Sequence, residues 1–291
     1  MRLIYLIILI ESAAILKNNA IISEFTIDNI GFSNIRQREG NWMFDTGHIQ
    51  TITFTNATFN DVGSQDEGDE TSGILHINTL DLNSQFDIEV SNIFISNSSA
   101  NFISFGSIVN TSSVIKFFEI HNFTYIDSFI EANRKLLSTE DIKVKQNLVI
   151  NFTLITFEKI SFLKTGTLIS FGHELSDNVF VVGLVITKII AGKLHIESTN
   201  KQLIDVYTLV SIHDSVFDSI DDKYSSLIIT GNGARLNVTN SSFTNIYTYE
   251  EGAVVYAGST ATQVNFHDVI FINNSAVTGA LFHIEAESVV R

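Results

Sequence analysis

Residues 264–284 read VNFHDVIFINNSAVTGALFHI, and this stretch decides the fold. It begins with alternating apolar and polar residues, continues through an Asn pair, and ends in a Gly followed by apolar residues. Residues 236–257, LNVTNSSFTNIYTYEEGAVVYA, repeat that order, with Phe243 in the place of Phe271. Alternation with a period of two predicts strands, and the Asn and Gly positions predict turns between them. The stretch is therefore one unit of an internal repeat.

One element of this unit, a small residue followed by alternating apolar residues, recurs along the whole chain. A second element, an alternating strand that ends in Phe and leads to Asn or Asp, precedes most of its copies. The copies return after about 27 residues in most cases and after more than 30 in three. They begin at Asn41, Gly73, Asn101, Ser128, Gly166, Gly192, Ser226, Gly252 and Gly279.

A repeat of this length predicts an all-β, right-handed parallel β-helix of about nine coils of roughly 27 residues. The solenoid is expected to form one domain over residues 15–291. Each strand would pair with its equivalents one coil away, at about 4.8 Å, and Phe, Ile and Leu would fill the bore. The alternative is a β-sandwich, whose short strands are also closely spaced. Hairpin turn signals are nearly absent, Asn232-Gly233 being the exception, and this favours the solenoid.

The composition excludes several classes of function. The chain has 291 residues, no cysteine, no proline and a formal net charge of −15. Without cysteine there is no disulfide, thiolate metal site or cysteine nucleophile. Sparse, scattered Lys and Arg on an acidic chain argue against nucleic acid as a partner. A chain paired strand to strand has few places for proline, although an AT-rich genome would deplete proline as well.

The N-terminus predicts export. Arg2 precedes an apolar run from Leu3 to Ile10, and small residues follow the run. This order is typical of a secretory signal peptide, here residues 1–14, and the run is too short to span a bilayer. The alternative is an apolar first strand of the solenoid or a helix that caps it.

Residues 271–282, FINNSAVTGALF, resemble the F-x-N-N-x-A-x-x-G-G-A-I repeat of right-handed β-helix surface proteins of the pectin-lyase-like type. Those include the chlamydial polymorphic membrane proteins and large membrane proteins of ciliates, and the residue bias suits the ciliate or protist type. The match to this repeat is clear in the last two coils. In the other coils the Gly-Gly of the repeat is replaced by a single Gly or is absent. The resemblance implies a secreted or cell-surface protein, with any membrane anchor outside this segment. It also implies that the chain is a fragment of a longer solenoid.

The sequence lacks the motifs with which β-helix enzymes cleave polysaccharides. A polygalacturonase-like site needs clustered Asp residues with Gly-His-Gly and Arg-x-Lys nearby, and neither tripeptide occurs. Asp221-Asp222 is interpreted as a solvated corner, because adjacent residues on a turn point in different directions. A lyase-like site needs calcium carboxylates beside a basic residue. No repeating acidic cluster accompanies Arg36, Arg38, Arg134 or Arg235.

No cofactor and no metal site are predicted. His76 and His195 occupy the same repeat position, but about four coils would place them roughly 19 Å apart, too far to share a metal ion. The acidic run from Asp61 to Glu70 offers oxygen ligands for Ca²⁺. It lacks the alternate-residue spacing of a calcium loop and is interpreted as a solvated loop.

Glycosylation is predicted if the chain is exported, because Asn-x-Ser/Thr sequons are the acceptors of N-glycans. The sequence holds eight sequons, at Asn56, Asn97, Asn110, Asn122, Asn151, Asn237, Asn240 and Asn273.

Three coil connections are long and are expected to leave the rod as loops, near Asp61–Ser72, Glu131–Asn147 and Glu197–Tyr207. The second connection carries the densest basic cluster of the chain, which could bind an acidic partner or a glycan. The cluster consists of Arg134, Lys135, Lys143 and Lys145. A spacer without a partner is the alternative interpretation.

Two functions follow from these observations. The first is a non-enzymatic structural or adhesive protein, secreted or on the cell surface, with glycans or surface proteins as partners. The second is a polysaccharide lyase or glycoside hydrolase with a non-standard site. The absent motifs favour the first function. A lateral groove that holds two or three carboxylates and a basic residue would favour the second.

Overall fold

The structure is a computed structural model, and part of the chain is described by it. The described residues are 16–18, 22–37, 42–46, 49–64, 72–77, 85–105, 114–130, 134–138, 148–162, 166–171, 182–196, 204–206, 209–222, 226–230, 234–249, 252–257, 262–284 and 289–291. The predicted signal peptide, residues 1–14, lies outside them.

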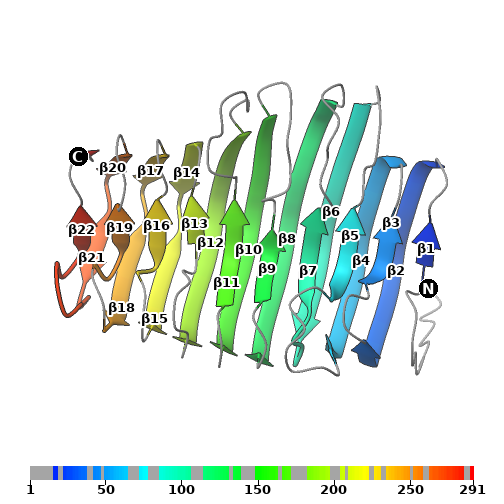
Figure 1. The fold of residues 1–291 in the computed structure, drawn as a ribbon, viewed down its shortest axis with the longest axis horizontal. Helices are drawn as coiled ribbons and strands as arrows, with labels where there is room; N and C mark the ends of the chain where they lie inside the picture. The colour runs from blue at the N-terminus through cyan, green and yellow to red at the C-terminus, as the bar shows by residue number, and fades with distance from the viewer. Residues whose placement is uncertain are drawn as a thin grey trace.

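Ten short strands form one sheet, here called the short-strand sheet (Figure 1). In stacking order they are β1 (Leu16–Asn18), β3 (Trp42–Thr46), β5 (Gly73–Ile77), β7 (Asn101–Phe105), β9 (Arg134–Ser138), β11 (Gly166–Phe171), β13 (Ile204–Val206), β16 (Ile228–Thr230), β19 (Val255–Ala257) and β22 (Phe282–Ile284).

The remaining thirteen described strands form the long-strand sheet. Its main path is β2 (Ile22–Gln37), β4 (Ile49–Ser64), β6 (Gln85–Ser96), β8 (Val114–Ile130), β10 (Leu148–Phe162), β12 (Val182–Ile196), β14 (Leu209–His213), β17 (Arg235–Thr239), β20 (Gln263–His267) and β23 (Val289–Val290). In the later coils the long strand is divided, and its second half forms β15 (Val216–Asp222), β18 (Ser242–Thr248) and β21 (Ile270–Ile272).

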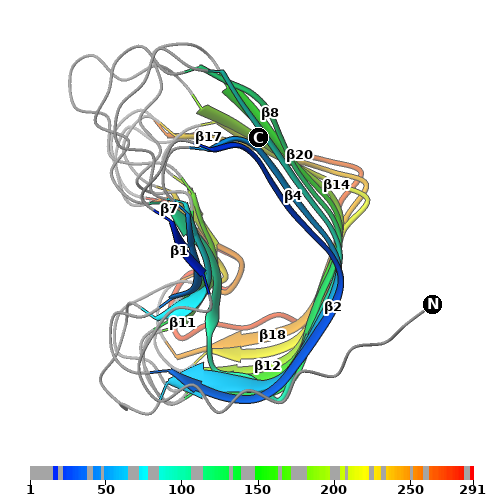
Figure 2. The same ribbon diagram turned by 90° about the vertical axis from the view of Figure 1, so that its right-hand side faces the viewer.

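Each strand pairs in parallel with its equivalent one coil away, so that Phe25 lies opposite Ile52 and Phe44 opposite Leu75. In Figure 1 the chain runs upward along β1 and downward along β2. Figure 2 views the rod from its N-terminal end, and there the chain turns clockwise as it moves away from the viewer. This is a right-handed parallel β-helix, the predicted fold class. Ten strands lie in the short-strand sheet and ten on the main path of the long-strand sheet, compared with nine copies found in the sequence.

Each long strand is bent twice, and the bends are made by residues in the left-handed backbone region. The first corner is formed by Asn29, Asn56, Asn92, Asn122, Leu154, Lys188, Asp214, Asn240 and Asp268, all with φ near +50°. The second corner is formed five residues later by Asn34, Asp61, Asn97, Asp127, Lys159, Lys193, Ser219, Asn245 and Asn273. Asn and Asp tolerate this region better than other residues with a Cβ. The segment between the corners is called the outer strip.

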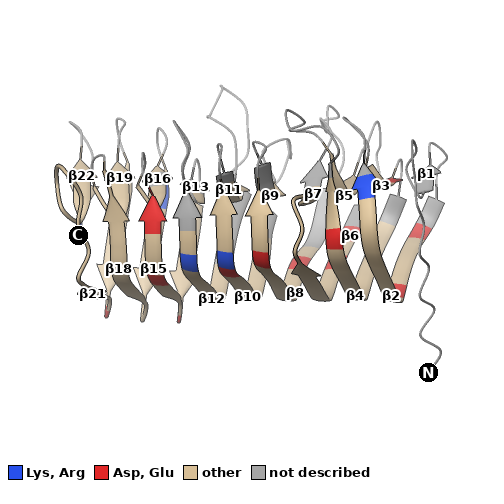
Figure 3. Ribbon diagram, turned by 90° about the horizontal axis from the view of Figure 1, so that it is seen from below, with Lys and Arg blue, Asp and Glu red and all other residues tan. Residues whose placement is uncertain are grey.

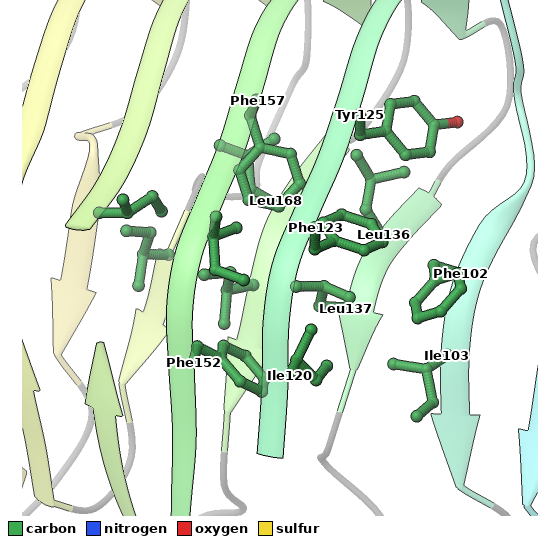
Figure 4. Packing of buried hydrophobic residues seen from close by; sticks show 14 of the residues in the cluster. Phe102, Ile103, Ile120, Phe123, Tyr125, Leu136, Leu137, Phe152, Phe157 and Leu168 are labelled. Atoms are coloured by element: carbon green, nitrogen blue, oxygen red, sulfur yellow. The ribbon is translucent and has the colours of Figure 1, made fainter. Parts of the chain in front are cut away.

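The bore is filled by aromatic and aliphatic side chains, as the alternation predicts. Phe217, Phe243 and Phe271 stack through three coils, with ring centroids 4.8 and 5.4 Å apart. Figure 4 shows Phe123 and Phe157 facing Leu136 and Leu168 across the bore. Such burial contributes about 1.5–3 kcal/mol for each large side chain, so the stack is the main source of stability.

The nine copies of the small-residue element were expected to be equivalent, but two of them lie in the long-strand sheet and the other seven in the short-strand sheet. Ser128-Phe129-Ile130 belongs to β8, and the copy from Gly192 to Ile196 belongs to β12. The short strands of those coils are β9 and β13 instead. A small residue with apolar ones after it also occurs beside the second corner, since Ser128 follows Asp127 and Gly192 precedes Lys193, so the pattern does not distinguish the two places.

The expectation that the long connections leave the rod is wrong for parts of all three. β9 lies within Glu131–Asn147, and Leu136 and Leu137 are fully buried in the bore. β13 lies within Glu197–Tyr207, and β4 extends to Ser64. A charged or polar stretch can still supply one short strand, because two inward residues are enough to continue the core.

Candidate functional site

The first corner carries a ladder of side-chain amides. The Asn56 Nδ2 donates to Asp28 Oδ1 at 2.7 Å, Asn92 Nδ2 donates to Asn56 Oδ1 at 3.0 Å, and Asn122 Nδ2 donates to Asn92 Oδ1 at 2.8 Å. The hydrogen bonds from Asn56 and Thr55 lower the pKa of the Asp28 carboxyl. An amide both donates and accepts, so identical residues can bond in series along the stack.

The second corner and the later coils repeat this chemistry. Asn97 Nδ2 donates to Asn60 Oδ1 at 3.1 Å, and Asn273 Nδ2 donates to Asn245 Oδ1 at 2.7 Å. Asn245 Nδ2 in turn donates to Asp218 Oδ1 at 3.0 Å. The corners are therefore polar ridges that run along the rod.

The coils of β10 and β12 depart from this pattern, because their four corner residues are Leu154, Lys159, Lys188 and Lys193. Two of the lysines reach the previous coil through ion pairs, Lys159 Nζ to Asp127 Oδ1 at 3.2 Å and Lys193 Nζ to Glu158 Oε1 at 2.9 Å. Figure 3 shows the basic residues on β10 and β12 beside the acidic residue of β8. Glu158 raises the pKa of the Lys193 ammonium. Ion pairs thus replace the amide ladder at the second corner of these coils.

Serine at the position after a corner residue is the second signature of the bends. Ser98, Ser128, Ser215 and Ser241 are buried there. The Ser98 Oγ donates to Ser96 O at 2.8 Å and accepts from the Val62 N–H at 3.1 Å. Ser241 makes the same pair of contacts, with Thr239 O and the Ser215 N–H. The hydroxyl oxygen takes the place of a backbone carbonyl as acceptor, so the backbone N–H of the previous coil keeps a hydrogen-bond partner at the bend.

Most of the predicted glycosylation residues are corner residues. Asn56, Asn97, Asn122, Asn240 and Asn273 are exposed and lie on the two ridges. Asn151 and Asn237 are half-buried on the outer faces of β10 and β17, and Asn110 lies outside the described residues. An Asn at a bend forms a sequon when Ser or Thr lies two residues later, so the preference for Asn at the corners accounts for part of their number.

The predicted basic loop is not a loop throughout. Arg134 and Lys135 begin β9, which pairs with β11 through Gly166↔Arg134 and Thr167↔Lys135. Lys143 and Lys145 lie outside the described residues. The structure therefore places two of the four residues at the start of β9, a strand paired on both sides within the short-strand sheet.

A polar column on the outer face of the short-strand sheet was missed by the sequence reasoning. His76 Nδ1 lies 3.1 Å from Asp45 Oδ1, and the His76 ring stacks on Trp42 with centroids 5.1 Å apart. Gly73 lies beneath the indole, where a Cβ would be 2.2 Å from the Trp42 ring. Ser104 follows His76 in register on the next coil. The Asp45 contact orients the imidazole on the outer face of the sheet.

His195 does not share the position of His76, because it lies on β12 opposite Ser161 and Asp221. The interpretation of Asp221-Asp222 as a solvated corner is also wrong. Both residues end β15, and Asp222 is only 1 % exposed. Asp61, the first residue of the acidic run, is a corner residue of β4 and forms an ion pair with Arg36.

Carboxylates do meet at one place on the long-strand sheet. Glu89 of β6 lies opposite Glu119 of β8, and Asp87 is two residues before Glu89 on the same outer face. Among the described residues, no group of three or more His, Asp or Glu is arranged to hold a metal ion. The pair therefore offers acid–base chemistry rather than a described metal site.

A single search of the sequence could have located the ridges. Pairs of Asn or Asp five residues apart occur at Asn29 and Asn34, at Asn56 and Asp61, and at Asn92 and Asn97. Each pair marks the two bends of one coil. The polar column has no comparable signal, because its members are about 30 residues apart and of different kinds.

No helix among the described residues is long and apolar enough to cross a membrane. Comparison with known proteins found no matching family model, no matching curated protein and no matching solved structure.

Proposed function

We propose that this chain is a secreted or cell-surface structural or adhesive protein, non-enzymatic and N-glycosylated. We further propose that it is of the pectin-lyase-like repeat type, with repeats like those of the polymorphic membrane proteins and of ciliate or protist surface proteins. The observation that carries the proposal is the rod itself, with its parallel coils stacked in register and two polar ridges along its length. A rod of this kind holds its outer faces in fixed positions, which suits display and adhesion.

Export is tested by the fate of the N-terminus. The full chain, expressed in a secretory eukaryotic host, is expected to lose about residues 1–14 and to gain sugar mass that a glycosidase removes. A variant with Ile7→Asp and Ile8→Asp interrupts the apolar run and should stay in the cell. A wild-type chain that keeps Met1 and carries no sugar would contradict the proposal.

Adhesion is tested with glycan arrays and with binding to whole cells, since glycans and surface proteins are the proposed partners. The variant Arg134→Gln with Lys135→Gln and a second variant with Lys143→Gln and Lys145→Gln separate the start of β9 from the segment that follows it, and neither creates a sequon. Binding that persists in both variants places the contact on the strand faces instead. Absence of binding to every glycan and every cell type would contradict an adhesive role.

One observation favours a second function, a carbohydrate-active enzyme. Glu89 and Glu119 are paired in register on neighbouring strands whose backbones are about 4.8 Å apart, so rotation of the two side chains can bring their carboxyl groups to a similar separation. Retaining glycosidases place their two carboxyl groups about 5–5.5 Å apart. Reducing-sugar release from plant and algal polysaccharides by the wild type, lost in Glu119→Gln, would support this function. No release by the wild type would reject it.

A further inference from the structure

Phe94 has a large apolar side chain that is exposed to solvent on the outer strip. Its relative exposure is 40 %, and it lies in β6 between Thr58 of the previous coil and Thr124 of the next. Both threonines are much shorter than Phe94, so the ring rises above its neighbours. A single exposed apolar side chain is common on protein surfaces, so Phe94 gains its interest from the sequon residue beside it.

A sequon asparagine lies within reach of this ring. Asn97 is three residues after Phe94, occupies the second corner and is exposed. Three strand residues span about 10 Å, a length that an asparagine side chain with one attached sugar can bridge. The residue and the ring are both on the outer side of the coil, so a sugar on Asn97 can fold back over the strip.

The hydrogen bond of Asn97 leaves room for a sugar. The Nδ2 carries two hydrogens and donates one to Asn60 Oδ1 at 3.1 Å. An N-glycan replaces the other hydrogen, so modification and the ladder hydrogen bond can coexist at this atom.

The same relation recurs in the last described coil. Ile270, which is 57 % exposed, occupies the column of Phe94 and lies three residues before the sequon residue Asn273. Other coils have Thr58, Thr124, Thr156 and Ser242 in this column, and their second-corner residues are not sequons. At both second-corner sequons, therefore, a bulky apolar residue lies three residues earlier. Ile190 and Val216 are apolar residues in the same column whose coils have no sequon at the second corner.

We propose that Asn97 carries an N-glycan whose first sugar packs on the ring of Phe94. The C–H groups on one face of a sugar ring are weakly positive, and the face of an aromatic ring is negative, so the two surfaces attract and exclude water. The glycan covers apolar surface that the fold leaves open. This inference rests on the proposed glycosylation and names the residue that the sugar contacts.

The test is a cycle of four proteins, the wild type, Ser99→Ala, Phe94→Ala and the double variant. Each full chain is placed behind a secretion leader of the host, so the result does not depend on residues 1–14. Ser99→Ala removes the sequon but keeps Asn97 and its ladder hydrogen bond. Phe94→Ala removes the ring, and it avoids the new sequon that Thr at this position would create two residues after Asn92. Glycopeptide mass spectrometry measures occupancy at Asn97.

The expected result is that loss of the sugar lowers the melting temperature by about 2 °C when Phe94 is present and not when Ala replaces it. Trimming the glycan to a single N-acetylglucosamine should retain the difference, because the first sugar makes the contact. Ile190→Thr, in the same column without a sequon, is the matched control and should show no dependence on the sugar.

Each contrary outcome has a distinct meaning. An unmodified Asn97 beside other occupied sequons overturns this inference and leaves the proposed glycoprotein standing. An occupied Asn97 with the same effect on melting in both backgrounds overturns the contact. Sugar on no sequon at all rejects both the inference and the proposed glycosylation.

Discussion

At the scale of single residues, the protein depends on asparagines that do two things at once. A corner asparagine adopts a left-handed backbone conformation, and its side chain links one coil to the next. The first property concerns φ and the second concerns hydrogen bonding, so substitutions can separate them. Asn92 is suited to this, because it both donates and accepts in the ladder and is not part of a sequon.

Asn92→Gly should lower the free energy of unfolding by about 1–2 kcal/mol, because two inter-coil hydrogen bonds are lost while φ stays accessible. Asn92→Ala should cost about 1 kcal/mol more, because Ala is strained in the left-handed region. Urea denaturation of both variants measures the difference. Equal values for Gly and Ala would mean that the backbone conformation of this corner costs nothing.

Leu154 is the corner residue least suited to its position, since it has neither polar atoms nor an easy left-handed conformation. Leu154→Asn should raise the free energy of unfolding by about 1 kcal/mol by relieving strain and extending the ladder from Asn122. The measurement uses unglycosylated protein, because the change creates an Asn-Ile-Thr sequon at residues 154–156. Leu154→Ala keeps the strain and is the control, expected to be neutral or destabilising. If the Asn variant is no more stable than the Ala variant in the same denaturation assay, the ladder adds no stability here.

At the scale of elements, short strands hold the rod together through few residues. β9 has five residues, yet Leu136 and Leu137 are both fully buried against the bore. β9 also joins β7 to β11 in the short-strand sheet. A segment that reads as a charged connection is therefore part of the core.

Leu137→Ala should lower the free energy of unfolding by about 2–5 kcal/mol, as expected for a cavity in a packed core. Phe129→Ser, on the outer face of the neighbouring β8 and exposed, is the control and should change it by less than about 0.5 kcal/mol. Deleting Arg134–Lys145 should likewise destabilise the rod strongly. A deletion variant that melts like the wild type would show that β9 is dispensable.

At the scale of the whole molecule, stability is a sum over coils and their interfaces, as in other solenoids. A side chain in the bore therefore contributes more to the free energy of unfolding when neighbouring coils cover it on both sides. Phe243 is fully buried between Phe217 and Phe271, whereas Phe271 is only partly buried.

Phe243→Ala should cost about 3–5 kcal/mol, within the usual range for a buried Phe. Phe271→Ala should cost clearly less than Phe243→Ala, because part of its ring already contacts solvent. Hydrogen exchange followed by mass spectrometry can compare the two, since it reports which coils lose protection. Equal costs at the two positions would mean that the bore around Phe271 is as well covered as the bore around Phe243.

The sequence by itself determined the fold class, the inward position of Phe residues such as Phe59 and Phe243, and the absence of cysteine chemistry, whereas Phe94 of the same element faces outward. A two-residue alternation and a return after about 27 residues in most coils depend only on local pattern. Tertiary structure alone decided which sheet each copy joins. Ser128-Phe129-Ile130 and residues 134–138 both carry apolar residues, and only the stacking against neighbouring coils shows that β9 is the short strand. The Asp45–His76 contact was equally out of reach of the sequence. Register brings together residues 31 positions apart, and register is set by the lengths of the turns and by the fit of the bore, which no local pattern records.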